Sequence, residues 1–385
     1  MAEAYIVAAA RTAGGRRGGR LSGWHPADLG AQALNALVDR AGIDPALVED
    51  VIMGCVMQVG EQGINIARNA ALAAGFPETT VGTTIDRQCG SSQQAAHFAA
   101  QGVMAGVHDI VIAAGVEVMT RVPMGATVMS GPGLPFGSKM NDRYATVGGL
   151  VPQGISAELI ADKWGLSREE LDAFSVQSHQ RAARAIEEGR FEKEIVAVSG
   201  ADGGVFDRDE GVRPESSVEK LATLKPAFKP DGKVTAGNSS QISDGAAALL
   251  IMSEDRAKQL GLTPRARFHT FALAGVDPVM MLTGPIPATT KVLERAKMTI
   301  DQMDLIEINE AFAPVVLSWE KEHHPDMSKV NVNGGAIALG HPVGSTGSRL
   351  ITTALHELER SDRSTALVAM CCGNSLSSFT IIERI

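Results

Sequence analysis

The sequence predicts an α/β protein built from two similar layered halves, and three observations lead to this fold class. Short apolar runs alternate along the chain with helical patterns, which is typical of strands in a covered, mostly parallel sheet. Glycine accounts for 41 of 385 residues and aromatic residues for only 4%, a composition that suits tightly packed layers with many turns. The third observation is an internal repeat, in which one order of elements occurs twice.

Each copy of the repeat has a short apolar run, a small-residue turn, a helical segment and a second apolar run. These segments cover residues 44–56, 83–106 and 109–119 in the first copy, and residues 299–312, 329–358 and 364–379 in the second. We expect two similar layered domains packed face to face. We place the first half at residues 1–252 and the second half at residues 253–385.

The remaining elements follow the chain order. The apolar run at residues 4–10 follows Glu3 rather than a basic region, so we predict a buried first strand and not a signal peptide. An insertion at residues 120–238 is predicted to be a loop domain, and such domains usually cover or bind something. Within it, Ser167 and Glu170 match a capping box that predicts a helix reaching about residue 191.

Charge and composition exclude several function classes. The formal net charge of −9 argues against a broad nucleic-acid-binding surface. No apolar run reaches the length of a membrane span, so we expect none. Four cysteines without an export signal indicate a reducing compartment, and the cytoplasm is the expected location.

Cysteine positions give the first candidates for chemistry. Cys89 follows a strand-like segment and precedes a turn and helix start, where the helix dipole and free N–H groups would lower the thiol pKa and favour the thiolate. The segment alone leaves two interpretations open, a reactive nucleophile or a small buried core residue. Cys371 and Cys372 end an apolar run, and adjacent strand side chains point to opposite faces. Only one of these two can therefore reach a site beside Cys89.

Other cysteine and histidine residues have simpler interpretations. Cys55 lies in a strand-like run, which indicates core packing. His323 and His324 lack further ligands at suitable spacing, so they indicate a solvated helix end, and we predict no metal site. His341 lies among four glycines at residues 332–345, which predict a tight turn or a close approach of the backbone.

Four motifs in register carry a family resemblance. They are the cysteine in DRQCGSS, NEAF at residues 309–312, GGAIALGHPVG at residues 334–344 and CCG at residues 371–373. Together they resemble the thiolase family of acyl-CoA C-acetyltransferases, from about residue 7 to the C-terminus. The resemblance implies duplicated αβαβα domains with an inserted loop domain, and a homodimer or homotetramer. It also implies an acyltransferase with coenzyme A as a substrate and no tightly bound cofactor.

The resemblance assigns roles to five residues. Cys89 is the implied nucleophile that carries the acyl group, and His341 takes its proton. Cys371 would exchange the proton at the α-carbon of the acetyl unit. Asn309 would hold a water that binds one thioester oxyanion together with His341. The backbone N–H groups of Cys89 and Gly373 would bind the other oxyanion.

The resemblance also implies contacts to coenzyme A and to the acyl group. Ser240 would touch the pantetheine arm, and Arg213 would lie near the adenine nucleotide. Four further residues would line the pantetheine channel or wall the acyl pocket, and could equally be packing residues: Phe228 and Ala236 in the channel, Met281 and Phe312 at the pocket.

Three departures from the family pattern concern the substrate. Residues 374–378 read NSLSS where relatives are richer in glycine, so we expect a different pocket floor here, while Cys371 and Gly373 are kept. Pro152 and Gln153 stand where short-chain thiolases usually carry His-Met or Met-Met. We infer a reshaped acyl pocket that favours a bulky sterol- or ring-derived CoA ester. No cation-site feature marks an acetoacetyl-specific mitochondrial type.

The expected function is therefore a 3-ketoacyl-CoA thiolase. It would cleave 3-ketoacyl-CoA with CoA to acetyl-CoA and a shortened acyl-CoA, reversibly, in fatty-acid β-oxidation or steroid degradation, with or without a β-oxidation multienzyme partner. A biosynthetic acetoacetyl-CoA thiolase is the first alternative. A decarboxylating ketosynthase is the second, although it would not need Cys371. A non-catalytic acyl-CoA-binding protein is the third, although such proteins typically lack a catalytic residue and none is missing here.

Overall fold

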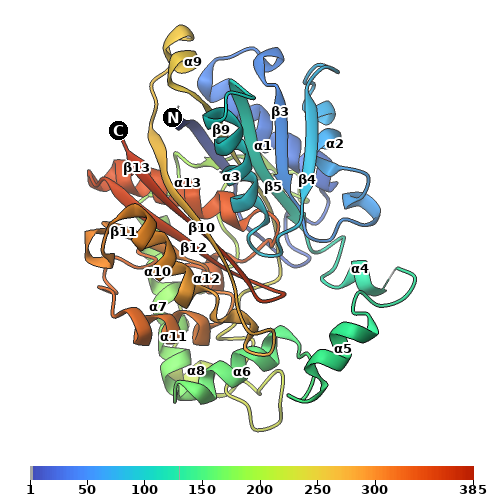
Figure 1. The fold of residues 1–385 in the computed structure, drawn as a ribbon, viewed down its shortest axis with the longest axis vertical. Helices are drawn as coiled ribbons and strands as arrows, with labels where there is room; N and C mark the ends of the chain where they lie inside the picture. The colour runs from blue at the N-terminus through green and yellow to red at the C-terminus, as the bar shows by residue number, and fades with distance from the viewer. Residues whose placement is uncertain (1–2, 130) are drawn as a thin grey trace.

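A computed structural model of the chain describes residues 3–129 and 131–385. Its strands form one large mixed sheet in the order β11-β12-β13-β10-β1-β9-β5-β3-β4 (Figure 1). The strands of the first repeat are β1 (Ala4–Thr12), β3 (Asp50–Gly54), β4 (Val81–Ile85), β5 (Ile110–Val118) and β9 (Ser243–Ser253). Those of the second are β10 (Ala266–Gly275), β11 (Leu305–Ile308), β12 (Thr365–Cys372) and β13 (Leu376–Arg384).

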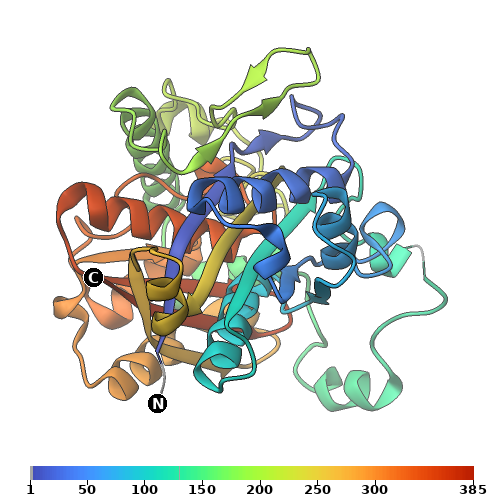
Figure 2. The same cartoon turned by 90° about the horizontal axis from the view of Figure 1, so that it is seen from above.

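The two repeats use the same strand pattern. β3 and β5 pair in parallel and β5 and β9 antiparallel, just as β11 and β12 pair in parallel and β12 and β13 antiparallel. The counterpart of β4 is reduced to a single parallel bridge between Ile306 and Val330. Antiparallel pairing of β1 with β10, at Tyr5 with Arg267 and Ile6 with Ala266, joins the two strand groups. In both views the start of β1 and the end of β13 lie near each other (Figures 1 and 2).

Helices cover the strands in layers. α3 (Ser91–Met104) and α13 (Thr346–Ser361) contact each other and strands of both groups, so they form the middle layer. α1 (Pro26–Ala41) and α2 (Ile66–Ala73) cover the first strand group, and α10 (Pro285–Ala296) covers the second together with α11 (Ala313–His323). This arrangement confirms the predicted duplicated αβαβα fold class.

Small apolar residues explain why α3 can occupy the middle layer. Its four alanines at positions 95, 96, 99 and 100 are fully buried, which lets the helix approach both strand groups closely. β5 is buried along its whole length, as its continuous apolar sequence predicts for a sheet covered on both faces. Cys55 follows β3 rather than lying inside it, but it is fully buried as predicted.

The inserted segment contains five helices and three short strands. They are α4 (Ala126–Met129), α5 (Ser138–Ala145), α6 (Gln153–Lys163), α7 (Arg168–Glu187), β6 (Ile195–Val196), β7 (Val198–Ser199), β8 (Val205–Phe206) and α8 (Val218–Ala222). The capping box of Ser167 and Glu170 is present at the start of α7. The helix ends at Glu187, earlier than predicted, because Gly189 adopts a left-handed conformation with φ of 70°. Figure 1 shows α4 and α5 on an arm that projects from the body at lower right.

The other elements are β2 (Gly15–Arg16), α9 (Glu254–Gln259), α12 (Ala336–Leu339) and the 3-10 turns η1 (Pro45–Leu47), η2 (Gly60–Gln62), η3 (Met281–Thr283) and η4 (Ile300–Gln302). Across residues 3–129 and 131–385, no helix is both long and apolar enough to cross a membrane.

Candidate active site

Cys89 and His341 occupy equivalent positions in the two repeats. Cys89 lies between β4 and the middle-layer helix α3, and His341 lies between the bridge at Val330 and the other middle-layer helix, α13. The N-terminal ends of these two helices touch, because the backbone N–H of Ser348 donates to Ser92 Oγ at 2.9 Å. The internal repeat therefore brings the two candidate residues toward one region.

Glycines allow this close approach of backbone to backbone. A Cβ on Gly347 would lie 2.3 Å from the backbone nitrogen of Gln93 in the opposite helix. A Cβ on Gly115 would lie 2.4 Å from the carbonyl oxygen of Gly344. No side chain fits at either position, so the two helix starts could not meet with larger residues there.

Cys89 is a buried thiol, and its protonation differs from the sequence-based prediction. Burial raises the pKa of the Cys89 thiol to about 11, although hydrogen bonds from the backbone N–H groups of Gly373 and Cys89 itself lower it. The prediction that the helix terminus favours the thiolate is wrong. Because α3 begins only at Ser91, after the N-cap Gly90, its dipole does not offset the loss of solvent around the sulfur.

Cys371 and Cys372 point to opposite sides of β12, as predicted. Cys371 packs in an apolar cluster with Ala311 and Phe312, whereas Cys372 lies in the middle-layer core. Burial, chiefly, and the nearby Cys89 raise the pKa of both thiols, and Cys372 shares its core cluster with Cys89, so both sulfurs lie near Cys89. These contacts do not confirm the prediction that only one of the two reaches a site beside Cys89. The Cys371 Sγ also lies 4.0 Å from the carbonyl oxygen of Asn309.

His341 contacts two polar side chains. Its Nε2 lies 3.4 Å from Asn309 Nδ2, and its Nδ1 lies 2.6 Å from Thr346 Oγ1. Burial, with a smaller effect of Arg349, lowers the pKa of the imidazole to about 3, so the ring is neutral. Asn309 Oδ1 is buried, and none of the described residues donates a hydrogen bond to it. This oxygen suits a water or substrate group, as expected for the role predicted for Asn309.

Glu117 holds the turn that carries His341. This fully buried carboxylate accepts hydrogen bonds from the backbone N–H groups of Val56 and Met57, after β3, and from Gly344 in the histidine turn, at 2.9, 3.1 and 2.9 Å. It thereby ties the ends of β3 and β5 in one repeat to the histidine turn of the other. We did not predict this residue from the sequence, although a lone acid in the apolar run at residues 110–119 was a usable signal.

Glu310 holds the segment that carries Asn309, as Glu117 holds the turn that carries His341. Its buried carboxylate accepts hydrogen bonds from Ser178 Oγ at 2.6 Å, from Asn331 Nδ2 at 2.9 Å and from the backbone N–H of Ile337 at 3.1 Å. These bonds fix the residues after β11 against α7 and α12. Asn309, which directly precedes this carboxylate, is held in place by them.

Gly340, directly before His341, is a position where the backbone requires glycine. Gly340 adopts φ of 89° and ψ of 168°, a region that is essentially restricted to glycine. A Cβ there would also lie 2.2 Å from Ser243 Oγ, which accepts the backbone N–H of His341 at 3.2 Å. The glycine therefore sets the direction in which the chain enters His341.

A Gly340→Ala variant is expected to lose about 3 kcal/mol of unfolding free energy and most of its activity, because strain and steric overlap both displace His341. Denaturant unfolding and steady-state kinetics measure the two effects. Gly261 is a matched control, because its φ is 68° and a Cβ there would have no atom within 4 Å. Gly261→Ala should cost about 1 kcal/mol and leave activity intact. Equal activity of the two variants would contradict the role of Gly340.

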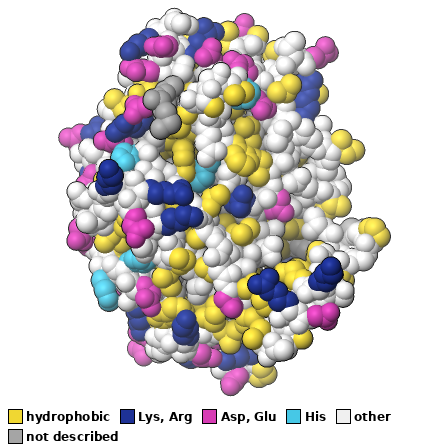
Figure 3. All heavy atoms as spheres, in the orientation of Figure 1, with side chains coloured by type: hydrophobic (Ala, Val, Ile, Leu, Met, Phe, Trp, Pro, Cys, Tyr) yellow, Lys and Arg dark blue, Asp and Glu magenta, His cyan; other side chains and the backbone are white. Residues whose placement is uncertain are grey.

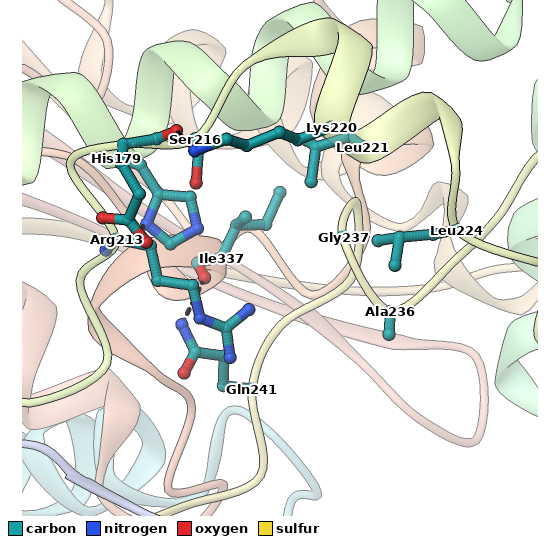
Figure 4. A pocket seen from close by; sticks show the side chains of 11 residues that line it. His179, Arg213, Ser216, Lys220, Leu221, Leu224, Ala236, Gly237, Gln241 and Ile337 are labelled. Carbon is teal, nitrogen blue, oxygen red and sulfur yellow. Dashed lines mark hydrogen bonds between the residues drawn. The ribbon is translucent and has the colours of Figure 1, made fainter.

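The predicted coenzyme A contacts fall into two places. Arg213 and Ala236 line one pocket of about 190 Å³, with His179 and Lys220 as basic neighbours that we did not predict. Figure 4 shows Arg213 and His179 on one side of this pocket and Ala236 on the other. Glu215 also lines the pocket, and burial lowers the pKa of His179 to about 4, so Arg213 and Lys220 are its cationic groups beside the apolar residues. Two cations against one carboxylate suit a phosphorylated nucleotide.

The other predicted contacts lie toward the thiols. The backbone N–H of Ser240 donates to the carbonyl oxygen of Ala311 at 2.9 Å, beside Phe312. The rings of Phe228 and Phe312 meet edge to face with centroids 6.0 Å apart. Met281 packs against the same apolar cluster as Phe312 and Cys371. The structure thus brings these predicted contact residues together around Cys371.

Gln153, at the start of α6, borders the catalytic turn. A Cβ on Gly373 would lie 2.4 Å from Gln153 Nε2 and 3.1 Å from Gln88 Oε1. Two side-chain amides therefore pack directly on the glycine whose N–H group bonds Cys89. The departure from the family pattern at position 153 therefore places a polar side chain against Gly373.

The adjacent histidines at the end of α11 differ in part from the prediction. His324 is exposed, but His323 is half-buried, and its Nε2 lies 2.9 Å from the carbonyl oxygen of Ile286. This bond holds the helix end against α10 rather than leaving it solvated. Within the described residues, no group of His, Cys, Asp and Glu is arranged to hold a metal ion.

Comparisons with known proteins agree with this geometry. Residues 4–255 match the family model "Thiolase, N-terminal domain", and residues 262–384 match "Thiolase, C-terminal domain". The chain is 51% identical over 389 residues to steroid 3-ketoacyl-CoA thiolase FadA6 of Mycobacterium tuberculosis, covering 100% of this chain and 95% of that protein.

Solved structures show the same fold. An acetyl-CoA acetyltransferase from Bacillus anthracis superimposes with a TM-score of 0.91 at 40% identity, covering 100% of this chain and 99% of that one. A human mitochondrial 3-ketoacyl-CoA thiolase in complex with CoA also gives a TM-score of 0.91, at 37% identity, with 100% and 98% coverage. With sequence and fold matched from end to end around paired thiols, a histidine and an asparagine, the chain belongs to the thiolase family.

Proposed function

We propose that the protein is a 3-ketoacyl-CoA thiolase that uses CoA to cleave a 3-ketoacyl-CoA into acetyl-CoA and an acyl-CoA shorter by two carbons. The observation that carries this proposal is one buried region in which Cys371 Sγ lies 4.0 Å from the Asn309 carbonyl oxygen and Asn309 Nδ2 lies 3.4 Å from His341 Nε2. The backbone N–H of Gly373, two residues after Cys371, bonds Cys89 in the same region. Carbon–carbon cleavage through an acyl-cysteine needs both a nucleophile and a second acid or base, and two thiols meet that need. A decarboxylating ketosynthase would not need the second thiol.

The first half of the reaction uses both thiols. His341 Nε2 takes the proton of Cys89 as the sulfur attacks the 3-keto carbon of the substrate. The bond between the second and third carbons then breaks, and Cys371 donates its proton to the second carbon. Acetyl-CoA leaves, and the shortened acyl group stays on Cys89.

The second half restores the enzyme. The Cys371 thiolate takes the proton of the incoming CoA thiol, and the CoA sulfur attacks the acyl carbon on Cys89. The departing Cys89 sulfur recovers its proton from His341. The backbone N–H groups of Cys89 and Gly373 stabilise one oxyanion, and His341 stabilises the other together with a water that Asn309 holds. Each donor of this kind is worth about 3–4 kcal/mol.

The coenzyme A substrate is proposed to lie between the two contact regions. Arg213 and Lys220 line the pocket that suits the charged adenine nucleotide. Ser240 and Phe228 then follow the pantetheine arm toward Cys89. A human mitochondrial thiolase of the same fold has been solved with CoA, which supports CoA as the substrate here.

The acyl group is proposed to be bulky and derived from a sterol or another ring system. Gln153, which packs against Gly373 from the start of α6, supports this substrate class, because a short-chain pocket is expected to be apolar at this position. The relative at 51% identity is named a steroid thiolase, which supports the same conclusion.

A kinetic survey with CoA and 3-ketoacyl-CoA esters, from acetoacetyl-CoA to polycyclic side chains, tests activity and specificity together. We expect release of acetyl-CoA, with kcat/KM for bulky esters about tenfold or more above that for acetoacetyl-CoA. Comparable values across the series would contradict the bulky substrate but not the thiolase activity. Absence of acetyl-CoA with every ester would contradict the activity itself.

The protein is further proposed to act in the cytoplasm as a homodimer or homotetramer. The arm that carries α4 and α5 exposes apolar side chains, among them Met129, Leu134 and Phe136. Figure 3 shows apolar and basic side chains side by side on this arm at lower right. A second copy of the chain would bury these side chains.

A further inference from the structure

The hydrogen-bond partner of His341 Nδ1 is a hydroxyl group and not a carboxylate. Thr346 Oγ1 lies 2.6 Å from this nitrogen and also 2.9 Å from the carbonyl oxygen of Pro342. All three groups are buried, so solvent does not replace either contact. The position of the single hydroxyl proton therefore decides which ring nitrogen of His341 carries a hydrogen.

The contacts on the two sides of the ring indicate which nitrogen of His341 carries the hydrogen. The geometry has the Thr346 hydroxyl donating to the Pro342 carbonyl, which leaves the hydroxyl oxygen to accept from Nδ1–H. On the other side of the ring, Asn309 Nδ2 lies 3.4 Å from Nε2, too far for a strong hydrogen bond, so this contact leaves the Nε2 lone pair available. The Thr346 contact therefore selects the tautomer with hydrogen on Nδ1, and the Asn309 contact is compatible with it.

We infer that Thr346 is a positioning residue that holds His341 as the Nδ1–H tautomer, so that Nε2 keeps a free lone pair for the proton of Cys89. The inference rests on the proposed function, and it adds a residue that acts on the reaction only through His341.

The charged and titratable groups around the ring fit this arrangement. Arg349, one turn further along α13, is the charge that acts on His341 among the described residues. Cys89 before α3 and Cys371 at the end of β12 are the thiols of the site, and the carboxylate of Glu117 is bound to the backbone of the histidine turn at Gly344. A hydroxyl partner orients the ring without adding a negative charge that would favour the imidazolium. The proton taken from Cys89 is therefore easily returned.

The test compares Thr346→Val, which keeps the shape but removes the hydroxyl, with Thr346→Ser, which keeps the hydroxyl. Thr352→Val is the matched control, because Thr352 is also buried in α13 and its hydroxyl donates to the carbonyl four residues earlier, at 2.8 Å, without touching His341. The Pro342 carbonyl still receives the backbone N–H groups of Ser345 and Thr346 when the hydroxyl is lost.

Two measurements are made on each variant, the kinetics of thiolysis and the rate of Cys89 alkylation by iodoacetamide followed by peptide mass spectrometry. For Thr346→Val we expect kcat and the alkylation rate at pH 7 to fall about 10- to 100-fold, with KM changed less than about twofold. Thr346→Ser and Thr352→Val should stay close to the wild type in both measurements.

The following outcomes would contradict the role of Thr346. Wild-type alkylation of Cys89 in Thr346→Val would show that the hydroxyl does not set the state of His341. An equal loss in Thr346→Val and Thr352→Val, or a loss that Thr346→Ser does not restore, would assign the effect to helix packing. Because alkylation needs no CoA ester, it tests Thr346 even if no substrate is turned over, which would contradict only the proposed function.

Discussion

Cys89→Ser is expected to abolish thiolysis, lowering kcat by about 10⁴-fold or more. A serine hydroxyl in this buried site is a far weaker nucleophile than a thiol, and His341, whose pKa burial lowers to about 3, is too weak a base to take the proton of a hydroxyl efficiently. The variant should fold normally, because serine differs from cysteine by one atom. Acetyl-CoA release and mass spectrometry of the acylated intermediate, trapped in the wild type and missing in the variant, measure the effect.

Cys55→Ser is the matched control for this change. Cys55 is also a fully buried cysteine, and burial with the neighbouring Glu117 raises the pKa of its thiol. Its replacement should leave kcat within about threefold of the wild type, since serine fits the same space and keeps a donor for Glu117 Oε1, which lies 3.8 Å from Cys55 Sγ. Turnover by Cys89→Ser at a comparable rate, or an acyl adduct on another cysteine, would overturn the assignment of the nucleophile.

His341→Gln is expected to change how the alkylation of Cys89 depends on pH. In the wild type the thiol pKa is about 11 and the imidazole pKa is about 3, so both groups are neutral between these values. A preformed thiolate–imidazolium pair is rarer than free thiolate at these pKa values, so His341 can assist only by taking the proton while the sulfur attacks, and this route does not depend on pH as long as both groups are neutral. Alkylation of the wild type should therefore be nearly independent of pH from about pH 5 to 7 and rise above that range, where free thiolate takes over.

Without the imidazole, Cys89 must release its proton to solvent. Below its raised pKa the thiolate fraction grows about tenfold for each pH unit, so the alkylation rate of His341→Gln should rise just as steeply and be lowest at acidic pH. His97→Gln is the control, because His97 is also buried and burial lowers its pKa to about 3 as well. This control should keep the flat profile. A flat profile in His341→Gln would show that another group takes the proton.

The internal repeat made much of the fold and the site predictable. The family resemblance implied Cys89 and His341 as partners, and the alternation of strand side chains separated Cys371 from Cys372. The structure confirmed the layered fold class. The half boundaries at residues 252 and 253 and the roles of individual site residues stay predictions.

Properties that depend on the surroundings in three dimensions were not predictable. The protonation of Cys89 depends on how completely other segments bury it, and burial reversed the effect expected from the helix terminus. Glu117 acts on a turn that is 227 residues away in the sequence. Thr346 is only five residues from His341, but its role depends on which of its neighbours the hydroxyl donates to.

The reduced contact between β1 and β10 has a consequence for biosynthesis. β13 must pair along β10 before the second strand group is complete, and β13 follows all the other strands in the sequence. His341 and Cys371 are translated shortly before β13, whereas Cys89 is translated about 250 residues earlier. A nascent or truncated polypeptide that lacks this segment thus carries its reactive sulfur without a proton acceptor, and competence is acquired only when the segment has been made.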